Sequence, residues 1–451
     1  MRLCDALGVQ RGEVVAFIGA GGKTSALVRL GEELRADGWR VLATTTTRIA
    51  EDELEFFPCA IPLELVETPQ QLSALLTEHG LVFLYDRLWG GKAMGLSPQT
   101  VSGLVDTLDS DAILVEADGS RRYPLKAPYD HEPVVPMETT LAVPVAGMNA
   151  LGKPFNSKTV YNVEKIVERY GFPLEKPIQA AWIAQIVRDE TLGLQGIPEG
   201  IRTVPLLNRV KKGLIYRLKA RRAAQLILQQ ERVHAVIMGQ VKKDESPVVE
   251  VQRRIAAIVL AGGLSRRMGQ SKPLLPWGNQ TVIEAIVRRI MPLRLNDVVV
   301  VTGYRSADVK AVLKDSGART VHNRRFASGE MLSSLQAGLS ALDDSISACI
   351  VFLGDQPQIS ARLVHQVMTA YAEGQGGIVA PSFMNRRGHP ILIDRRYWRD
   401  LLDLPDGGAP RDVINANSDD IAYVVTDDES ILRDMDTPEE YRAALRRAGL
   451  A

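Results

Sequence analysis

The sequence lacks several features that mark specialised classes of protein. It has only three cysteines among 451 residues, and Cys4, Cys59 and Cys349 lie far apart with no C-x-x-C pair. This pattern indicates neither a disulfide framework nor a cysteine zinc site. The amino-terminal residues show no basic stretch followed by an apolar one, and no run of 18 apolar residues occurs anywhere. We therefore expect a cytoplasmic protein that neither spans nor is exported across a membrane.

The sequence also lacks an excess of charge of either sign. Lysine plus arginine total 54 and aspartate plus glutamate total 54, so the formal net charge is zero. Nucleic acid and anionic membranes are therefore not expected as partners. Hydrophobic residues make up 45% and charged residues 24%, which is typical of soluble globular proteins. The length favours two or three domains.

Two segments begin with the same local pattern about 240 residues apart. Residues 14–19 (VVAFIG) and 255–263 (IAAIVLAGG) are apolar runs that end in glycine, and each is followed by a glycine loop and helical periodicity. The polar and charged stretch 240–254, just before the second of these segments, contains Pro247. We predict an α/β protein with a P-loop-like domain over 1–245, a linker over 246–254 and a second domain over 255–451. Each domain is expected to hold a mostly parallel, Rossmann-like sheet with helices on both faces.

The segment 260–272 (LAGGLSRRMGQSK) carries the strongest chemical signal. Small residues directly after a buried strand let backbone amides approach phosphate oxygens, while Arg267 and Lys272 supply positive charge. These residues predict a triphosphate site; the alternative is a glycine turn beside a surface basic cluster. G-x-G-x-x-G cannot be threaded through the segment, which argues against a dinucleotide fold.

A carboxylate follows a second strand of this domain. Asp355 in FLGDQPQIS (352–360) stands where open α/β sheets bind ligands, and a hard oxygen ligand there suits Mg²⁺ bound to phosphates. The alternative for Asp355 is a turn-forming aspartate.

The 260–272 string resembles the signature of the nucleotidyltransferases that attach a nucleotide to molybdopterin. The resemblance continues through 352–360, HNRRFASGEMLSSLQAGL (322–339), NRRGHPILI (385–393) and RDMDTPEEY (433–441). It implies a nucleotidyltransferase fold, transfer of a nucleotide from its triphosphate to molybdopterin, and a Mg²⁺ requirement. It implies catalytic roles for Arg267, Lys272 and Asp355, nucleotide binding by Leu260, Ala261, Gly262, Gly263, Lys272 and Ser334, substrate binding by Arg387 and His389, and metal binding by Asp355 and Asp436.

Several of these assignments have structural alternatives. Asp436 precedes Thr437-Pro438 and could cap a helix instead of binding Mg²⁺. Ser334 could equally serve at a helix start, and a histidine before proline, as at His389, is as often structural as it is a pterin contact.

The resemblance also bears on the identity of the nucleotide. Cytidylyl-transferring members typically read LAAG and GDxP, and guanylyl-transferring members LAGG and CDxP with an aspartate before the lysine. Gly262 follows the guanylyl pattern, whereas Ser271 before Lys272, GDQP (354–357) and RGHP (387–390) follow the cytidylyl pattern. We therefore predict CTP and molybdopterin as substrates. The alternatives are guanylyl transfer, another nucleotidyl transfer to a small phosphate, or a cofactor chaperone without catalysis.

The first domain carries related but less specific motifs. Lys23 and Thr24 in GAGGKT resemble the end of a phosphate loop, but Phe17 stands where G-x-x-x-x-G-K-[ST] requires its first glycine. Glu116 and Asp118 end another strand and share one face of it. Together these residues predict nucleotide binding by Lys23 and Thr24, with Asp118 as a metal ligand and ATP or GTP as the nucleotide. Each alone is more often structural.

The motifs GAGGKT, TTTTRI, EADGSR and PLKAP resemble the selenium-dependent molybdenum hydroxylase accessory family over about residues 1–245. The resemblance implies a pathway, namely hydroxylase maturation, with a molybdenum hydroxylase apoenzyme as partner. Molybdenum hydroxylases commonly take a cytosine dinucleotide cofactor, which is a second reason to expect CTP.

Overall fold

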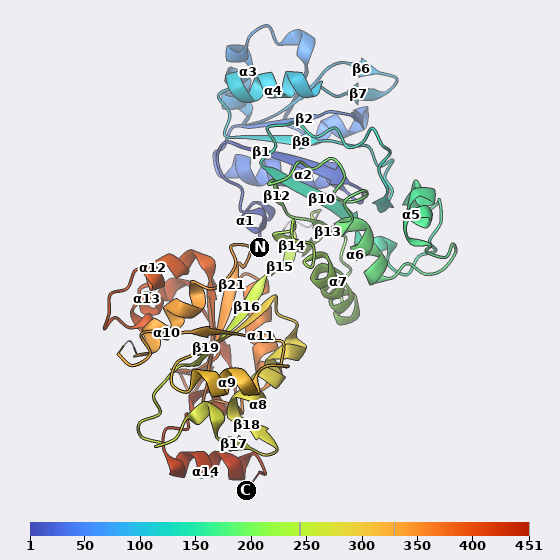
Figure 1. Ribbon diagram of the computed structural model, residues 1–451. Helices are drawn as coiled ribbons and strands as arrows, with labels where there is room; N and C mark the ends of the chain where they lie inside the picture. Colours follow the sequence, from blue (N-terminus) through green and yellow to red (C-terminus); the bar gives the residue numbers. More distant parts are fainter. Residues whose placement is uncertain (243–244, 329, 451) are drawn as a thin grey trace. The chain divides into compact units, whose positions relative to one another are not determined.

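A computed structural model describes residues 1–242, 245–328 and 330–450 of the chain. The chain divides into two compact units, Met1–Gln252 and Arg253–Ala451 (Figure 1). Each unit is built around its own sheet, as the sequence predicts.

The first unit contains a ten-stranded sheet in the order β15-β14-β13-β10-β1-β8-β2-β5-β4, with β12 beside β10. The pairs of β1 with β8 and β10, and of β2 with β5 and β8, are parallel. The strands are β1 (Glu13–Gly19), β2 (Val41–Thr45), β4 (Cys59–Pro62), β5 (Leu81–Tyr85), β8 (Ala112–Glu116), β10 (Leu141–Gly147), β12 (Arg202–Thr203), β13 (Leu206–Asn208), β14 (Ala235–Gly239) and β15 (Val248–Arg253).

Helices and two smaller sheets complete the first unit. The smaller sheets are β3 (Arg48–Ala50), β7 (Lys92–Met94) and β6 (Leu88–Trp89), and β9 (Leu125–Lys126) with β11 (Val160–Tyr161). The helices are α1 (Leu3–Leu7), α2 (Lys23–Ala36), α3 (Pro69–His79), α4 (Pro98–Thr107), α5 (Val163–Tyr170), α6 (Ala180–Arg188) and α7 (Leu214–Ile227), with short 3₁₀ turns at Glu51–Phe56, Leu63–Leu65 and Met148–Ala150.

The second unit has an eight-stranded mixed sheet in the order β20-β19-β16-β21-β24-β22-β23, with β25 beside β22. The half around β16 is parallel, whereas β24 runs antiparallel to both β21 and β22. The strands are β16 (Ile255–Ala261), β19 (Asp297–Thr302), β20 (Arg319–His322), β21 (Ala348–Leu353), β22 (Ile378–Phe383), β23 (Arg386–Arg387), β24 (Ile391–Asp394) and β25 (Ile421–Val425), with a separate hairpin of β17 (Pro276–Trp277) and β18 (Gln280–Thr281).

The helices of the second unit follow the apolar periodicity of the sequence. Thr281 caps α8, and its side chain accepts a hydrogen bond from the backbone N–H of Glu284 while Glu284 bonds back in a capping box. The helices are α8 (Val282–Ile290), α9 (Ser306–Val312), α10 (Glu330–Leu339), α11 (Ala361–Ala372), α12 (Trp398–Leu402), α13 (Pro410–Ala416) and α14 (Pro438–Arg447), with 3₁₀ turns at Lys272–Leu274, Met291–Leu293, Arg395–Tyr397, Ser418–Asp420 and Glu429–Leu432.

Alternate residues of the central strands enter separate apolar cores on the two faces of each sheet. In β1, Val15 and Phe17 join one core and Val14 and Ile18 another. The strand β16 divides in the same way between two cores of the second unit. The apolar runs of β1 and β16 are therefore buried on both faces of their sheets. The predicted α/β class with mostly parallel sheets is confirmed.

The segment predicted as a linker, 246–254, is not a linker in this structure. Most of it forms β15, the edge strand of the first sheet, with Val248 and Val251 in the first unit's core. Their side chains are buried as part of a strand, a pattern that the flanking charges and Pro247 obscured. Among the described residues, no helix combines the length and apolar character needed to cross a bilayer.

Candidate functional site

The glycine loop of the second unit lies at the carboxyl ends of two neighbouring parallel strands. β16 and β21 pair in register up to Leu260 and Leu353, so the loop that begins at Gly262 lies next to Gly354 and Asp355. A Cβ on Gly354 would lie 2.6 Å from the carbonyl oxygen of Leu260 and 3.0 Å from Cα of Ala261, so only glycine fits at this point. This close approach places the Asp355 carboxylate beside the loop.

A cavity of about 540 Å³ opens between these strand ends. Its size suits a small-molecule ligand. It is lined by Leu260, Ala261, Gly262, Gly263, Leu264, Ser265, Arg266, Arg267, Lys272, Pro273, Met331, Ser334, Leu353, Gly354, Asp355, Asp434 and Asp436. All of the residues that the sequence predicts for nucleotide binding and catalysis in this domain are in this set.

Lys272 joins the two carboxylates predicted to bind metal. Its Nζ lies 2.8 Å from Oδ2 of Asp355 and 2.5 Å from Oδ1 of Asp436. Arg267, whose side chain is 75% exposed, reaches Oδ2 of Asp436 at 2.6 Å. Asp355 and Asp436 lie 83 and 164 residues after Lys272 in the sequence, and the fold brings both carboxylates to its ammonium group.

The electrostatics of the cavity show in the pKa values of these groups. Burial acts to lower the pKa of Lys272, but the carboxylates of Asp355 and Asp436 outweigh it, and the pKa lies above its ordinary value. The hydrogen bond from Lys272 lowers the pKa of Asp436. Burial, together with the nearby charge of Asp355, raises the pKa of Asp434. Lys272 is therefore charged in this cavity, and its ammonium group is shared by two carboxylates.

The residues present fit a magnesium ion that arrives with phosphate oxygens. Among the residues that the structure describes, no group of three or more His, Cys, Asp or Glu side chains is placed to hold a metal by itself. Mg²⁺ is, however, usually held by one or two carboxylates together with substrate phosphates. Asp355 and Asp436 supply that donor set, and Lys272 lies between them.

Asp434 is a cavity residue that the sequence analysis missed. Its Oδ1 accepts a hydrogen bond of 2.9 Å from Nε2 of Gln356, which follows Asp355 directly. The signal was present in the sequence, because Asp434 and Asp436 are two residues apart in an extended segment after the 3₁₀ turn Glu429–Leu432. Asp434 is thus a third carboxylate in the wall of the same cavity.

The loop itself offers unpaired hydrogen-bond donors. None of the backbone N–H groups of residues 263–267 donates a hydrogen bond to another residue in the described ranges. The loop closes on itself through Ser265, whose Oγ accepts from the backbone N–H of Lys272 at 3.1 Å. Free backbone amides beside cationic side chains are an arrangement that proteins commonly use to bind anions.

Ser334 lines the cavity and is positioned by a buried amide. Asn323, which is 3% exposed, donates from Nδ2 to Oγ of Ser334 at 3.1 Å and to Oγ of Ser333 at 2.8 Å. Ser334 Oγ would also lie 3.0 Å from a Cβ placed on Gly262. The serine is therefore held against the glycine loop.

Arg387 and His389, predicted to bind substrate, do not line this cavity. Arg387 donates from Nη2 to Oδ1 of Asn415 at 3.1 Å, and the backbone N–H of His389 donates to the carbonyl oxygen of Ile431 at 3.3 Å. A Cβ on Gly388 would lie 2.4 Å from that same carbonyl oxygen. In this structure the RGHP segment packs against the turn that precedes Asp434. It therefore supports a segment of the cavity wall and does not itself line the cavity.

The partly buried His389 makes stability depend on pH. Burial, with the nearby charge of Arg387, lowers its pKa to about 4 from 6.5. Between these values the unfolded chain binds the proton and the folded chain does not, so stability is full above pH 6.5 and falls as the pH drops toward 4. We expect the free energy of unfolding of the second unit to fall by about 2 kcal/mol more over this window in the wild type than in His389→Gln, measured by urea denaturation at pH 7 and pH 4. Equal losses in both proteins would contradict this expectation.

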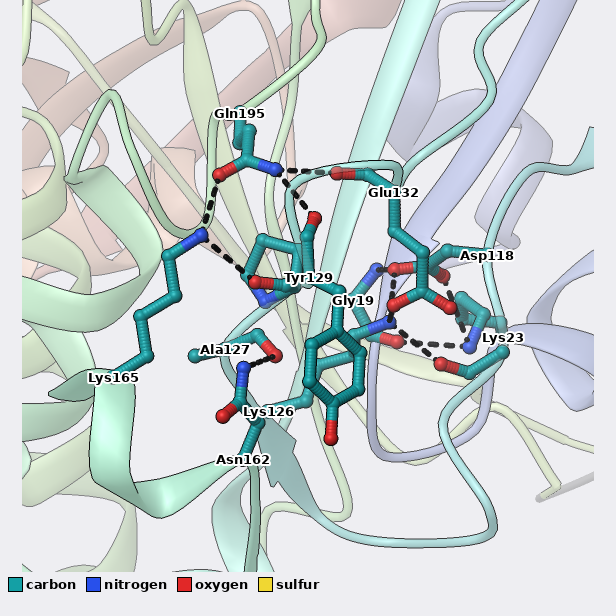
Figure 2. A network of polar contacts seen from close by, with 12 residues as sticks. Gly19, Lys23, Asp118, Lys126, Ala127, Tyr129, Glu132, Asn162, Lys165 and Gln195 are labelled. Atoms are coloured by element: carbon teal, nitrogen blue, oxygen red, sulfur yellow. Dashed lines mark hydrogen bonds and ion pairs between the residues drawn. The ribbon is translucent and has the colours of Figure 1, made fainter.

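In the first unit, the predicted residues Lys23, Thr24 and Asp118 also come together. Nζ of Lys23 lies 3.2 Å from Oδ1 of Asp118 and 3.5 Å from Oε1 of Glu116, and Oγ1 of Thr24 donates to Oε2 of Glu116 at 2.8 Å. Lys126 contacts Asp118 at 2.9 Å from the other side (Figure 2). A glycine loop and the end of the neighbouring strand thus meet here as well.

Comparison with known proteins assigns each unit to a family. Residues 15–164 match the YqeC protein family, and residues 257–421 match the MobA-like NTP transferase domain. An uncharacterised protein named YqeC from Escherichia coli is 32% identical over 243 residues, which cover 52% of this chain and 91% of that protein.

Two relatives match the second unit. The molybdenum cofactor cytidylyltransferase of Escherichia coli is 26% identical over 194 residues, covering 43% of this chain and 96% of that protein. A protein of Bacillus cytotoxicus named "Probable molybdenum cofactor guanylyltransferase" is 28% identical over 207 residues, covering 43% of this chain and 97% of that protein. Both resemblances stated from the sequence are confirmed: the chain belongs to the YqeC family through its first unit and carries a MobA-like nucleotidyltransferase domain in its second.

Proposed function

We propose that the second unit transfers CMP from CTP to molybdopterin, forming the cytosine dinucleotide cofactor and pyrophosphate. The observation that carries this proposal is the convergence of Lys272, Asp355 and Asp436 on one cavity beside the glycine loop. That arrangement supplies positive charge, free amides and metal-binding carboxylates within reach of one triphosphate.

The reaction needs positioning and charge stabilisation more than proton transfer. An oxygen of the terminal phosphate of molybdopterin forms a bond to the α-phosphorus of CTP, and the bond from that phosphorus to the bridging β-phosphate oxygen breaks, releasing pyrophosphate. The attacking phosphate is already ionised at neutral pH, so no general base is required. Lys272 and Arg267 would balance the negative charge that grows on the leaving pyrophosphate.

Asp355 and Asp436, with Asp434 nearby, would hold the magnesium ion. When bound, that ion neutralises phosphate charge and orients the phosphate oxygens. Lys272, which these carboxylates hold in the cavity, would contact phosphate oxygens of the nucleotide. The loop amides of residues 263–267 orient the same phosphates.

Sequence features and relatives support CTP over GTP. Ser271, GDQP (354–357) and RGHP (387–390) follow the cytidylyl pattern, and a relative named as a cytidylyltransferase aligns over nearly its whole length. Guanylyl transfer is the second candidate, because Gly262 follows the guanylyl pattern and a relative named for guanylyl transfer also aligns. The fusion to a YqeC unit supports delivery of the product to a molybdenum hydroxylase apoenzyme in the cytoplasm.

Product analysis decides between these functions. Purified full-length protein is incubated with molybdopterin, Mg²⁺ and equal concentrations of CTP and GTP, and the products are separated by chromatography. We expect the cytosine dinucleotide and pyrophosphate to dominate. A dominant guanine dinucleotide would overturn the choice of base, and the absence of any dinucleotide would overturn the proposed function in favour of a cofactor carrier.

A further inference from the structure

The loop after β1 in the first unit lies at a topological switch point, where the order in which the chain adds strands to the sheet reverses. From β1 the chain crosses through α2 to β2 on one side, with β8 between them, while β10 and the strands after it lie on the other side of β1. Loops that leave adjacent strands in opposite directions open a crevice at the carboxyl edge of the sheet, where α/β proteins bind ligands. The carboxyl ends of β1, β8 and β10 meet at this edge, and none of the residues there belongs to the cavity of the second unit.

Glycines let this loop lie against its neighbours without side chains. Gly19, Gly21 and Gly22 have φ values of +88°, +98° and +120°. A Cβ on Gly21 would lie 2.3 Å from the backbone nitrogen of Gly147, at the end of β10, and one on Gly22 would lie 2.6 Å from Nδ2 of Asn208. Nδ2 of Asn208 in turn donates to the carbonyl oxygen of Gly21 at 2.9 Å. The loop backbone is thereby fixed by strands on the far side of the switch point.

The same loop presents a run of unpaired donors. Within the described part of the chain, none of the backbone N–H groups of residues 21–25 donates a hydrogen bond, and α2, a helix of 14 residues, begins without a side-chain cap. Amides in this arrangement bind anions, and the helix dipole adds to their effect.

A buried cation stands beside these amides. Lys23 is 2% exposed, and its Nζ donates to the carbonyl oxygen of Gly19 at 2.8 Å in addition to its ion pairs with Asp118 and Glu116. Burial acts to lower the pKa of Lys23, but the two carboxylates outweigh it and raise the pKa above its ordinary value. Buried ion pairs of this kind add little stability compared with apolar residues of similar size.

One buried carboxylate oxygen in this cluster lacks a hydrogen bond. Asp118 is 2% exposed, and its Oδ2 accepts from the backbone N–H of Gly19 at 3.0 Å and contacts Lys126 at 2.9 Å. Its Oδ1 accepts no hydrogen bond among the described residues and has only the ion pair with Lys23. A buried oxygen of this kind, aimed at the loop lysine, is available to a cation or to water on a cation.

We propose that the first unit binds the phosphate chain of a nucleoside triphosphate together with a divalent cation at this loop. Lys23 and the amides of residues 21–25 contact the phosphates, and Thr24 with Glu116 and Asp118 holds the cation. This site is additional to the nucleotidyl-transfer site of the second unit and does not depend on it.

The charges in the network predict that the cation is required. Lys23 and Lys126 face the carboxylates of Asp118 and Glu132 and the carboxyl group of Glu116, whose pKa is raised by burial, and Lys126 contacts Glu132 at 2.8 Å (Figure 2). The cluster therefore has no excess of positive charge to offset a free triphosphate, whereas a divalent cation would offset it. Lys126 keeps Asp118 paired when Lys23 turns to the phosphates.

Binding of fluorescent, non-hydrolysable ATP and GTP analogues to the purified full-length protein, with and without Mg²⁺, tests this site. We expect Mg²⁺-dependent binding of at least one analogue, weakened at least about tenfold in Lys23→Met and in Thr24→Val, on the scale of lost charge-assisted contacts. The matched controls Lys158→Met and Thr77→Val change an exposed lysine and an exposed threonine elsewhere in the same unit, and both variants should bind the analogue as the wild type does.

A third variant separates this site from that of the second unit. Lys272→Met should abolish nucleotidyl transfer and leave the Mg²⁺-dependent binding of the analogue intact. Binding that is lost only in Lys272→Met, or that is unchanged in Thr24→Val, would overturn the proposal while leaving the transferase function untouched. Thr24→Val removes no charge, so it decides the outcome even if Lys23→Met fails to fold, and thermal unfolding of each variant verifies the fold.

Discussion

Replacing Asp355 with alanine is expected to lower the turnover of nucleotidyl transfer at least about 100-fold, the scale seen when one electrostatic stabiliser is lost. Asp355 lies on the cavity wall where β21 ends, and its carboxylate is one of the two that contact Lys272. Its removal takes away a ligand of the expected magnesium ion. The measurement is the initial rate of pyrophosphate release with saturating CTP, molybdopterin and Mg²⁺.

The fold should survive this change. Lys272 retains its contact with Asp436, so no buried charge is left alone. An exposed aspartate in the same unit, Asp315, provides the matched control as Asp315→Ala, which should leave both turnover and unfolding unchanged. A near-normal rate in Asp355→Ala would refute the role given to this carboxylate.

The central strands of both units could be predicted from the sequence because each contains a run of consecutive apolar residues. Runs such as residues 255–261 must be buried on both faces, and parallel strands covered on both sides are the usual result. The direction of the antiparallel strand β24 could not be predicted in the same way, because an apolar run of three residues carries no sign of its direction. The edge strand β15 was missed because polar and charged residues surround its few buried positions.

The candidate site was predictable where one motif fixes the local geometry. The loop of residues 260–272 was expected directly after a buried strand and Asp355 at the carboxyl edge of the sheet, and the structure brings them together around one cavity. Asp434 was missed although its spacing of two residues from Asp436 in an extended segment is the signal that both line the same cavity. Arg387 and His389 were expected from the resemblance alone, and their place depends on how β23 and the RGHP segment pack, which no local pattern encodes.

Both units use the same arrangement at the end of their first central strand. In each, a lysine that closes a glycine loop is held by carboxylates from other segments, Lys23 by Glu116 and Asp118 and Lys272 by Asp355 and Asp436. In both units the carboxylates raise the pKa of the lysine above its ordinary value, so the ammonium group stays charged although it is largely buried.

Replacing Gly303 with alanine is expected to destabilise the second unit by about 3 kcal/mol, a typical cost of overpacking without room to relax. Gly303 follows β19, and a Cβ there would lie 2.2 Å from the carbonyl oxygen of Gly262 and 2.5 Å from Cβ of Phe326. The carbonyl belongs to the glycine loop, so relief requires the loop to move away from the strand ends. We therefore expect both a lower urea midpoint and weaker CTP binding.

A second variant, Gly263→Ala, separates the loss of stability from the loss of CTP binding that we expect for Gly303→Ala. Gly263 is exposed, and a Cβ there meets no atom within 4 Å, so the unfolding free energy should stay within about 0.5 kcal/mol of the wild type. Its methyl group nonetheless projects from the loop that is expected to hold the phosphates, so CTP should bind more weakly, as measured by equilibrium titration. A Gly303→Ala protein that unfolds at the wild-type urea concentration would show that the loop can move freely, and the close contact between Gly303 and Gly262 would then not be what fixes the loop.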